Sequence, residues 1–215
     1  MARRTVYVVD DEEPIRGALR LMLTVQGYAV TMFNSGPSLL GVVDALVPGC
    51  LLLDVRMPEM DGIEVQRHLA ERGAGLPVVV MTGHGDLGVA VAAMQNGAIS
   101  FVEKPFTKSV LQQALGSAFL KLEDPAGYMR HRDGAAAAVA ALGEDERAVL
   151  VRLAAGRSNA KIAAELGLSP AIVEVRRARL LAELGAEHVS DLLRVAFAAG
   201  LGSTAEGYAT LPRDG

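Results

Sequence analysis

Five short apolar runs, separated by amphipathic segments, limit the fold of residues 5–122 more than any other feature of the sequence. The runs are residues 6–9, 29–33, 50–53, 78–81 and 99–102. Each is too short for a typical helix, whereas apolar residues recur at helical spacing between them, as over 15–23, 39–47 and 110–122. The pattern predicts a three-layer α/β domain with a doubly wound, mostly parallel sheet of five strands.

Composition limits the class of protein. The 215 residues are 51% hydrophobic and 21% charged, which is typical of globular domains. The single cysteine, Cys50, lies in an apolar run, so an internal disulfide is excluded and a reducing compartment is expected. No apolar run is long enough to span a membrane, and no signal peptide is recognisable. We therefore expect a cytoplasmic protein.

Polar residues follow four of the five predicted strands: Asp10 with Asp11, Asp54, Thr82 and Lys104. Taken alone, each has an ordinary explanation; helix capping, for example, would account for Asp10 or Asp11. In a parallel sheet, however, the carboxyl ends of the strands share one edge, which is where open α/β sheets bind their ligands. The joint occurrence therefore predicts one shared site.

The chemistry of such a site is specific. Three neighbouring carboxylates repel one another, and a hard divalent cation such as Mg²⁺ relieves that repulsion. An ionised aspartate is also a nucleophile toward phosphorus. An ammonium and a hydroxyl group, here from Lys104 and Thr82, would neutralise the phosphoryl oxygens. The pattern predicts phosphoryl transfer to Asp54.

In this order of motifs, residues 4–122 resemble the receiver domain of two-component response regulators. The strings Gly83-His84-Gly85-Asp86 and Glu103-Lys104-Pro105-Phe106 resemble its FixJ/NarL branch. The resemblance implies a sensor histidine kinase as partner, Mg²⁺ as cofactor and a cis Lys104-Pro105 peptide bond.

The resemblance also implies a role for each matching residue. Asp54 is the expected phosphoacceptor. The expected Mg²⁺ ligands are Asp10, Asp11, Asp54 and the backbone carbonyl of Arg56. The other expected site residues are Thr82, Lys104 and Phe101 as phosphate contacts and switch, Arg56 and His84 for tuning of dephosphorylation, and Val91, Gln95 and Phe101 at a dimer face.

An enzyme is the alternative for this half of the chain. Haloacid-dehalogenase-type phosphatases also use an aspartate nucleophile with Mg²⁺ on a doubly wound sheet. Their nucleophile opens an Asp-x-Asp motif after the first strand, whereas this chain has adjacent Asp10-Asp11 and an isolated Asp54 after the third. The order of motifs favours a receiver, with no enzymatic activity beyond its own phosphotransfer and dephosphorylation.

A change in composition separates this first domain, residues 1–122, from the rest. Pro125 predicts the end of the preceding helix, because the residue before proline avoids helical angles. We interpret residues 123–141 as a linker. Whether its alanine-rich part, residues 135–141, is helical stays open at this point.

Residues 142–205 contain no strand-like run and are predicted to form an all-α domain of four helices, followed by a tail, residues 206–215. Ser158 can cap the second helix, and Ser169 before Pro170 can cap the third. Gly167 lies in the short turn between these helices. This arrangement is typical of a helix-turn-helix.

The third helix carries the predicted DNA surface. Val173, Leu180 and Leu184 would face the core, which places Glu174, Val175 and Ala178 opposite. Basic residues outnumber acidic ones by 5 to 2 over residues 157–182, whereas the two are equal at 8 each over residues 143–201. A local basic excess of this kind favours DNA over a merely solvated helix face.

Residues 142–201 resemble the LuxR-type DNA-binding domain. They depart from it at Ile172, where threonine is usual, at Arg176, where histidine is frequent, and at Glu183, where lysine is common. The expected DNA contacts are Ser158, Asn159, Lys161, Ser169, Glu174, Val175, Arg176, Arg177, Ala178 and Arg179.

Together the two resemblances predict a FixJ/NarL-type response regulator. Phosphorylation would promote a homodimer that binds double-stranded promoter DNA and regulates transcription, with RNA polymerase as a further candidate partner. The alternative is a phosphorylation-gated interaction module whose second domain binds a protein, and the balanced charge of residues 143–201 motivates it.

Overall fold

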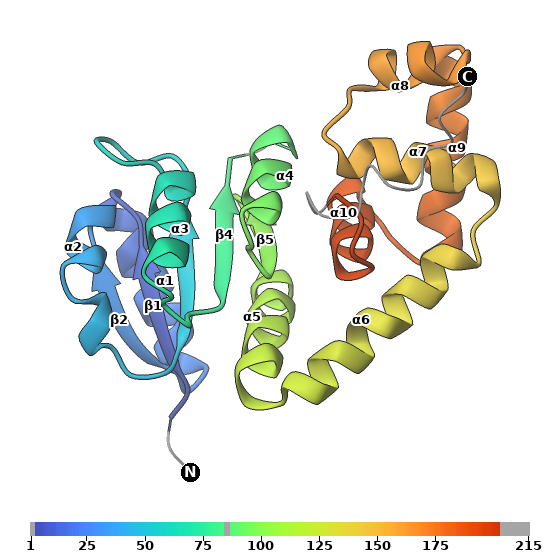
Figure 1. Cartoon of the computed structure of the whole chain (residues 1–215). Coiled ribbons are helices and arrows are strands. Elements are labelled where there is room, and N and C mark those ends of the chain that lie inside the picture. The colour runs from blue at the N-terminus through green and yellow to red at the C-terminus, as the bar shows by residue number, and fades with distance from the viewer. Residues whose placement is uncertain (1–2, 84–86, 203–215) are drawn as a thin grey trace. The chain divides into compact units, whose positions relative to one another are not determined.

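The structure, a computed structural model, describes residues 3–83 and 87–202. The chain forms two compact units that divide between Tyr128 and Met129 (Figure 1). Among the described helices, none is both long and apolar enough to cross a membrane.

The first unit is built on a five-stranded parallel sheet. Its strands are β1 (Thr5–Val9), β2 (Ala29–Phe33), β3 (Cys50–Asp54), β4 (Val78–Thr82) and β5 (Ser100–Glu103). They lie in the order β2-β1-β3-β4-β5, which confirms the predicted doubly wound sheet. Because every strand runs the same way, the residues that follow β1, β3, β4 and β5 meet at one edge.

Helices flank the sheet because alternate strand residues face opposite sides. They are α1 (Glu13–Val25), α2 (Gly36–Leu40), α3 (Gly62–Glu71), α4 (Leu87–Gln95) and α5 (Lys108–Glu123). Leu19 and Leu23 of α1 and Leu111 of α5 pack with Val8 and Leu52 of the sheet in one core cluster. The strand residues between these, including Tyr7, Leu51 and Leu53, are buried as well. A sheet covered in this way explains the continuous apolar runs.

One predicted helix is wrong in length. Spacing predicted a helix over 39–47, but α2 ends at Leu40 and only a short 3₁₀ turn, η1 (Val43–Ala45), follows. Arg72, directly after α3, donates to the Leu40 carbonyl at 2.6 Å, so this carbonyl is satisfied without a further turn of α2. Val47, which the helix would have buried, is 59% exposed.

The span predicted as a linker is largely helical. As expected, α5 ends at Glu123, just before Asp124 and Pro125. Helix α6 (Pro125–Ala140) begins at once, with Asp124 Oδ1 accepting from the Gly127 amide at 2.8 Å. The alanine-rich stretch is therefore helical through Ala140.

The second unit contains the four helices predicted from spacing: α7 (Glu144–Ala154), α8 (Asn159–Leu166), α9 (Pro170–Glu183) and α10 (Val189–Ala198). Ser158 Oγ caps α8 by accepting from the Lys161 amide at 3.3 Å, and Ser169 Oγ caps α9 by accepting from the Ile172 amide at 3.4 Å. Gly167 closes the turn at φ 64°. The predicted tail, residues 206–215, lies outside the described residues.

Candidate functional site

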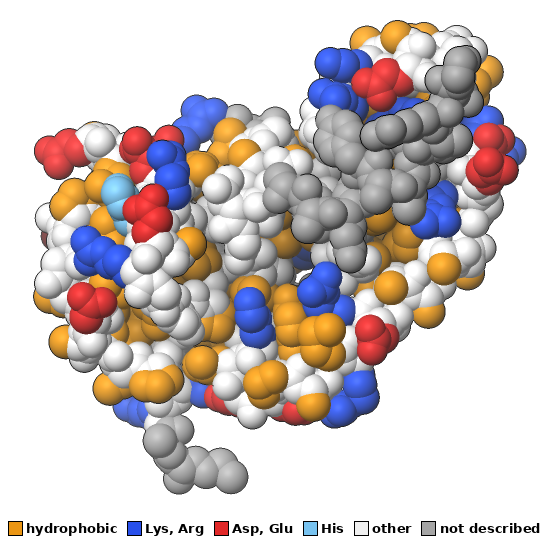
Figure 2. All heavy atoms as spheres, in the orientation of Figure 1, with side chains coloured by type: hydrophobic (Ala, Val, Ile, Leu, Met, Phe, Trp, Pro, Cys, Tyr) orange, Lys and Arg blue, Asp and Glu red, His pale blue; other side chains and the backbone are white. Residues whose placement is uncertain are grey.

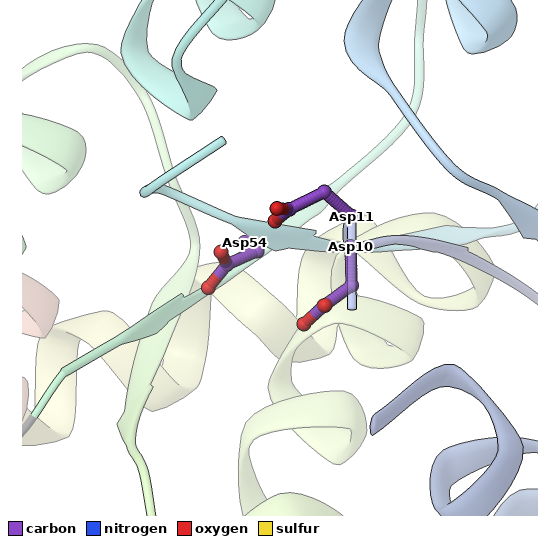
Figure 3. Close-up of side chains that lie close together, drawn as sticks. All are labelled: Asp10, Asp11 and Asp54. Atoms are coloured by element: carbon purple, nitrogen blue, oxygen red, sulfur yellow. The ribbon is translucent and has the colours of Figure 1, made fainter. Parts of the chain in front are cut away.

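Three carboxylates meet at the carboxyl edge of the sheet. Asp10 and Asp11 follow β1, and Asp54 ends β3. One oxygen of each carboxylate lies within 4.8 Å of those of the other two, and Figure 3 shows the three side chains around one space. Asp10 and Asp54 are buried, whereas Asp11 is exposed. The predicted cluster is therefore formed, and it offers oxygen ligands to a metal ion.

Lys104 completes this arrangement from the end of β5. Its Nζ lies 2.8 Å from Asp10 Oδ2 and 2.8 Å from Asp54 Oδ1. The Lys104-Pro105 peptide bond is cis, as the resemblance implied. One ammonium group thus links the two buried carboxylates.

Burial and the Lys104 ammonium group shift the pKa of Asp54 in opposite directions. Burial raises the pKa of Asp54 to about 6, although the hydrogen bond from Lys104 lowers it. Burial by itself would lower the pKa of Lys104, but its hydrogen bonds to Asp10 and Asp54 and the charges of these carboxylates together raise it. At neutral pH the site therefore keeps an ionised Asp54 beside a protonated Lys104.

Thr82, at the end of β4, brings a hydroxyl group to the same edge. It is buried, and its Oγ1 has no hydrogen-bond partner among residues 3–83 and 87–202. A buried polar atom without a partner costs free energy that a ligand can recover. Thr82 therefore offers an open donor beside the strand that ends in Asp54.

The second candidate site is the surface of α9. Val173 and Leu180 are buried, and Glu174, Val175 and Ala178 are exposed, as the helical spacing predicted. Ser158 and Ser169 act as the caps described above. Lys161 of α8 is exposed.

The three arginines of α9 do not form the free basic surface that the charge count indicated. Arg176 lies 2.7 Å from Asp145, Arg177 lies 3.1 Å from Glu174, and Arg179 lies 3.5 Å from Glu146. The side chains of Arg176 and Arg177 are only 17% and 21% exposed. On the face shown in Figure 2, acidic and basic side chains are likewise interspersed.

Comparison with known families decides what these two sites belong to. Residues 6–116 match the family described as "Response regulator receiver domain", and residues 140–196 match the family "Bacterial regulatory proteins, luxR family". The chain belongs to the two-component response regulators. It is of the FixJ type, with a receiver domain and a LuxR-type DNA-binding domain, and this architecture is that of a transcription regulator.

Its relatives match this response regulator over nearly their whole length. The transcriptional regulatory protein FixJ of Rhizobium meliloti (strain 1021) is 40% identical and covers 94% of this chain and 99% of its own. The C4-dicarboxylate transport transcriptional regulatory protein DctR of Rhodobacter capsulatus is 37% identical, and the match covers 89% of this chain and 98% of DctR. Among solved structures, full-length FixJ from B. japonicum matches with 38% sequence identity and a TM-score of 0.57. The match covers 93% of this chain and 98% of that FixJ chain.

Two features of the response regulator's site were not predicted from the sequence. Arg16 of α1 donates to the carbonyl oxygens of Asp10 at 2.8 Å and Asp11 at 2.7 Å, so it fixes the backbone of the acidic pair. Residue 62 must be a glycine because there is no room for a side chain: a Cβ there would lie 2.5 Å from the Asp54 carbonyl oxygen. Its position as the first residue of the helix that Asp61 caps was the available signal.

The other predicted receiver residues fall in the loop after β3, in α4 and in β5, or outside the described residues. Arg56 is exposed in the loop after β3, and His84 lies outside the described residues. Of the three residues expected at a dimer face, Val91 and Phe101 are buried and Gln95 alone is exposed. Their side chains therefore do not share one exposed surface in this structure.

Proposed function

We propose that Asp54 accepts a phosphoryl group from a sensor histidine kinase and that this modification controls promoter binding. The observation that carries the proposal is the arrangement around Asp54: Lys104 links it to Asp10, and the buried hydroxyl group of Thr82 has no hydrogen-bond partner within the described part of the chain. A phosphoryl group on Asp54 would supply acceptor oxygens for both donors.

The same carboxylates fit Mg²⁺. We infer that Asp10, Asp11, Asp54 and the backbone carbonyl of Arg56 would hold it, since hard cations prefer such oxygen ligands. When bound, the ion neutralises charge on the transferring phosphoryl group. Arg16 fixes the carbonyls behind two of these ligands, so the chain positions the acidic pair before any ligand binds.

The transfer itself needs little other machinery. A carboxylate oxygen of Asp54 attacks phosphorus as the bond from phosphorus to the donor imidazole nitrogen breaks, and that nitrogen keeps the electron pair. Lys104 and Thr82 hold the phosphoryl oxygens through this exchange. Later attack by water returns the carboxylate and inorganic phosphate, with Arg56 and His84 tuning the rate. The chain would catalyse no reaction on any other substrate.

The output follows from the second domain. We infer that binding of the phosphoryl oxygens repositions Thr82 and Phe101, after which two chains pair through α4 and β5, near Val91, Gln95 and Phe101. Because Val91 and Phe101 are buried here, their neighbourhood must repack for such a dimer to form. A two-fold dimer would bind a two-fold promoter site, where RNA polymerase is a further candidate partner.

The proposed boundaries are residues 1–122 for the receiver, 123–141 for the connection, 142–205 for the DNA-binding domain and 206–215 for the tail. We place the protein in the cytoplasm, because a promoter and the kinase domain that would donate the phosphoryl group are both found there.

Labelling tests the phosphoacceptor directly. Full-length protein would be incubated with Mg²⁺ and a small phosphodonor, and its mass measured. We expect one phosphoryl group in the wild type and in Asp44→Asn, a matched loss of one exposed carboxylate, but none in Asp54→Asn. Undiminished labelling of Asp54→Asn would reject the assignment.

The interaction-module alternative is tested separately. The match of residues 140–196 to a DNA-binding family favours DNA. Contacts to phosphates make affinity fall steeply with salt. If phosphorylated protein binds no promoter duplex in a salt-dependent way, the protein-partner alternative replaces DNA binding.

A further inference from the structure

Two large apolar side chains are exposed on α9, which is the second helix of the helix-turn-helix. Ile172 is 44% exposed and Val175 is 54% exposed. They lie in the first half of α9, and the N-terminal residues of such a helix contact base edges in the major groove. Branched apolar residues gain by leaving water, and the apolar group that a base pair offers in that groove is the C5-methyl of thymine.

The arginines that would otherwise recognise guanine are engaged within the domain. A bidentate contact to guanine needs a guanidinium group free to reach the N7 and O6 acceptors. Arg176 and Arg177 are only partly exposed and lie in ion pairs, with Asp145 of α7 and with Glu174 of α9. Arg179 is 66% exposed and lies 3.5 Å from Glu146, the longest of the three ion pairs, so its guanidinium group stays accessible to a phosphate.

Glu174 is held in place from two sides. Its Oε1 accepts from Asn159 Nδ2 of α8 and, at 3.1 Å, from Arg177 Nη1. Arg177 balances the negative charge, which lowers the repulsion between Glu174 and DNA. A carboxylate only accepts hydrogen bonds, and cytosine presents its N4 amino group as a donor in the major groove.

We propose that α9 recognises its DNA site through thymine methyl groups, which contact Ile172 and Val175, and through one cytosine amino group, which donates to Glu174. Arg176 and Arg177 position the helix and make no guanine contact. The inference rests on the proposed DNA binding and specifies which base chemistry it uses.

Base analogues test this directly. Phosphorylated full-length protein would select duplexes from a random pool, and each invariant thymine or guanine of the preferred site would then be replaced. We expect uracil, which lacks the methyl group, to weaken binding about fourfold at each contacted thymine, because one buried carbon group is worth about 0.8 kcal/mol. We expect 7-deazaguanine to change the Kd by less than about twofold, whereas loss of an arginine–guanine contact would cost roughly tenfold.

Variants connect these effects to single side chains. The Val175→Ala variant should bind with equal affinity whether one particular position of each half-site carries thymine or uracil. Glu174→Gln should lose preference for cytosine at one position. Glu183→Gln, an equal charge change at another exposed position of α9, should keep both preferences. Thermal unfolding confirms that each variant is folded.

The outcomes separate this inference from the proposed function. If the protein selects no duplex, DNA binding itself fails and the inference fails with it. If it selects a site that tolerates uracil throughout but weakens about tenfold with 7-deazaguanine, DNA binding stands and the proposed base recognition is overturned. Unchanged thymine preference in Val175→Ala and Ile172→Ala would overturn it as well.

Discussion

Removing the charge of Asp54 is expected to stabilise the metal-free protein at neutral pH. Burial raises the pKa of Asp54 from its ordinary value of 3.8 to about 6, against the effect of Lys104. Because the folded state then binds the proton more tightly than the unfolded state, stability falls as pH rises from below the ordinary pKa through the raised one. At about 1.4 kcal/mol per pKa unit, the shift corresponds to about 3 kcal/mol lost at neutral pH.

The lost contact of Lys104 reduces this gain. In Asp54→Asn the ammonium group keeps Asp10 at 2.8 Å, but its ion pair with Asp54 is gone. We therefore expect the variant to be more stable than the wild type by about 1–3 kcal/mol at neutral pH. Below the ordinary pKa of aspartate the difference should shrink toward zero, since Asp54 is then protonated in both states.

Urea unfolding in the presence of EDTA measures this difference. Tyrosine fluorescence mainly follows the first unit, which contains three of the four tyrosines of the chain: Tyr7, Tyr28 and Tyr128. Asp44→Asn serves as the control, because removal of an exposed charge typically changes stability by at most about 0.5 kcal/mol. An Asp54→Asn variant less stable than the wild type at neutral pH, or a difference independent of pH, would refute the reasoning.

Three further predictions concern individual contacts. Gly62→Ala should lower stability by about 1–3 kcal/mol, since its Cβ would lie 2.5 Å from the Asp54 carbonyl oxygen; an unchanged urea midpoint would contradict this. Burial raises the pKa of the Cys50 thiol to about 12, so folded protein should not react with a thiol reagent until urea is added. Arg176 lowers the pKa of Asp145, so Arg176→Met should destabilise the second unit at neutral pH, and the loss should fade as acid protonates Asp145 in titrations followed by circular dichroism.

The sheet and the site at its edge were predictable because parallel strands are buried on both faces. Such strands are continuous apolar runs in the sequence, and the residues after them share one edge by topology alone. Asp10, Asp54 and Lys104 could therefore be placed together before their distances were known. The same reasoning located the four helices of the second unit, whose caps, such as Ser158, are local in sequence.

What escaped prediction depends on partners far apart in the chain. The early end of α2 reflects Arg72, which lies 32 residues beyond Leu40. The charge count over residues 157–182 omitted the acids of α7, so it could not anticipate that Arg176 pairs with Asp145. Spacing gives the face of a helix on which a side chain lies, but not the partner that engages it.

The central claim is that phosphorylation of Asp54 controls DNA binding. The most direct test measures the affinity of full-length protein for its selected duplex while the fraction of phosphorylated chains, read from intact mass, is varied with a small phosphodonor and Mg²⁺. Affinity should rise with the phosphorylated fraction in the wild type and stay at its unphosphorylated value in Asp54→Asn. Affinity that does not change as the wild type becomes fully phosphorylated would contradict the claim.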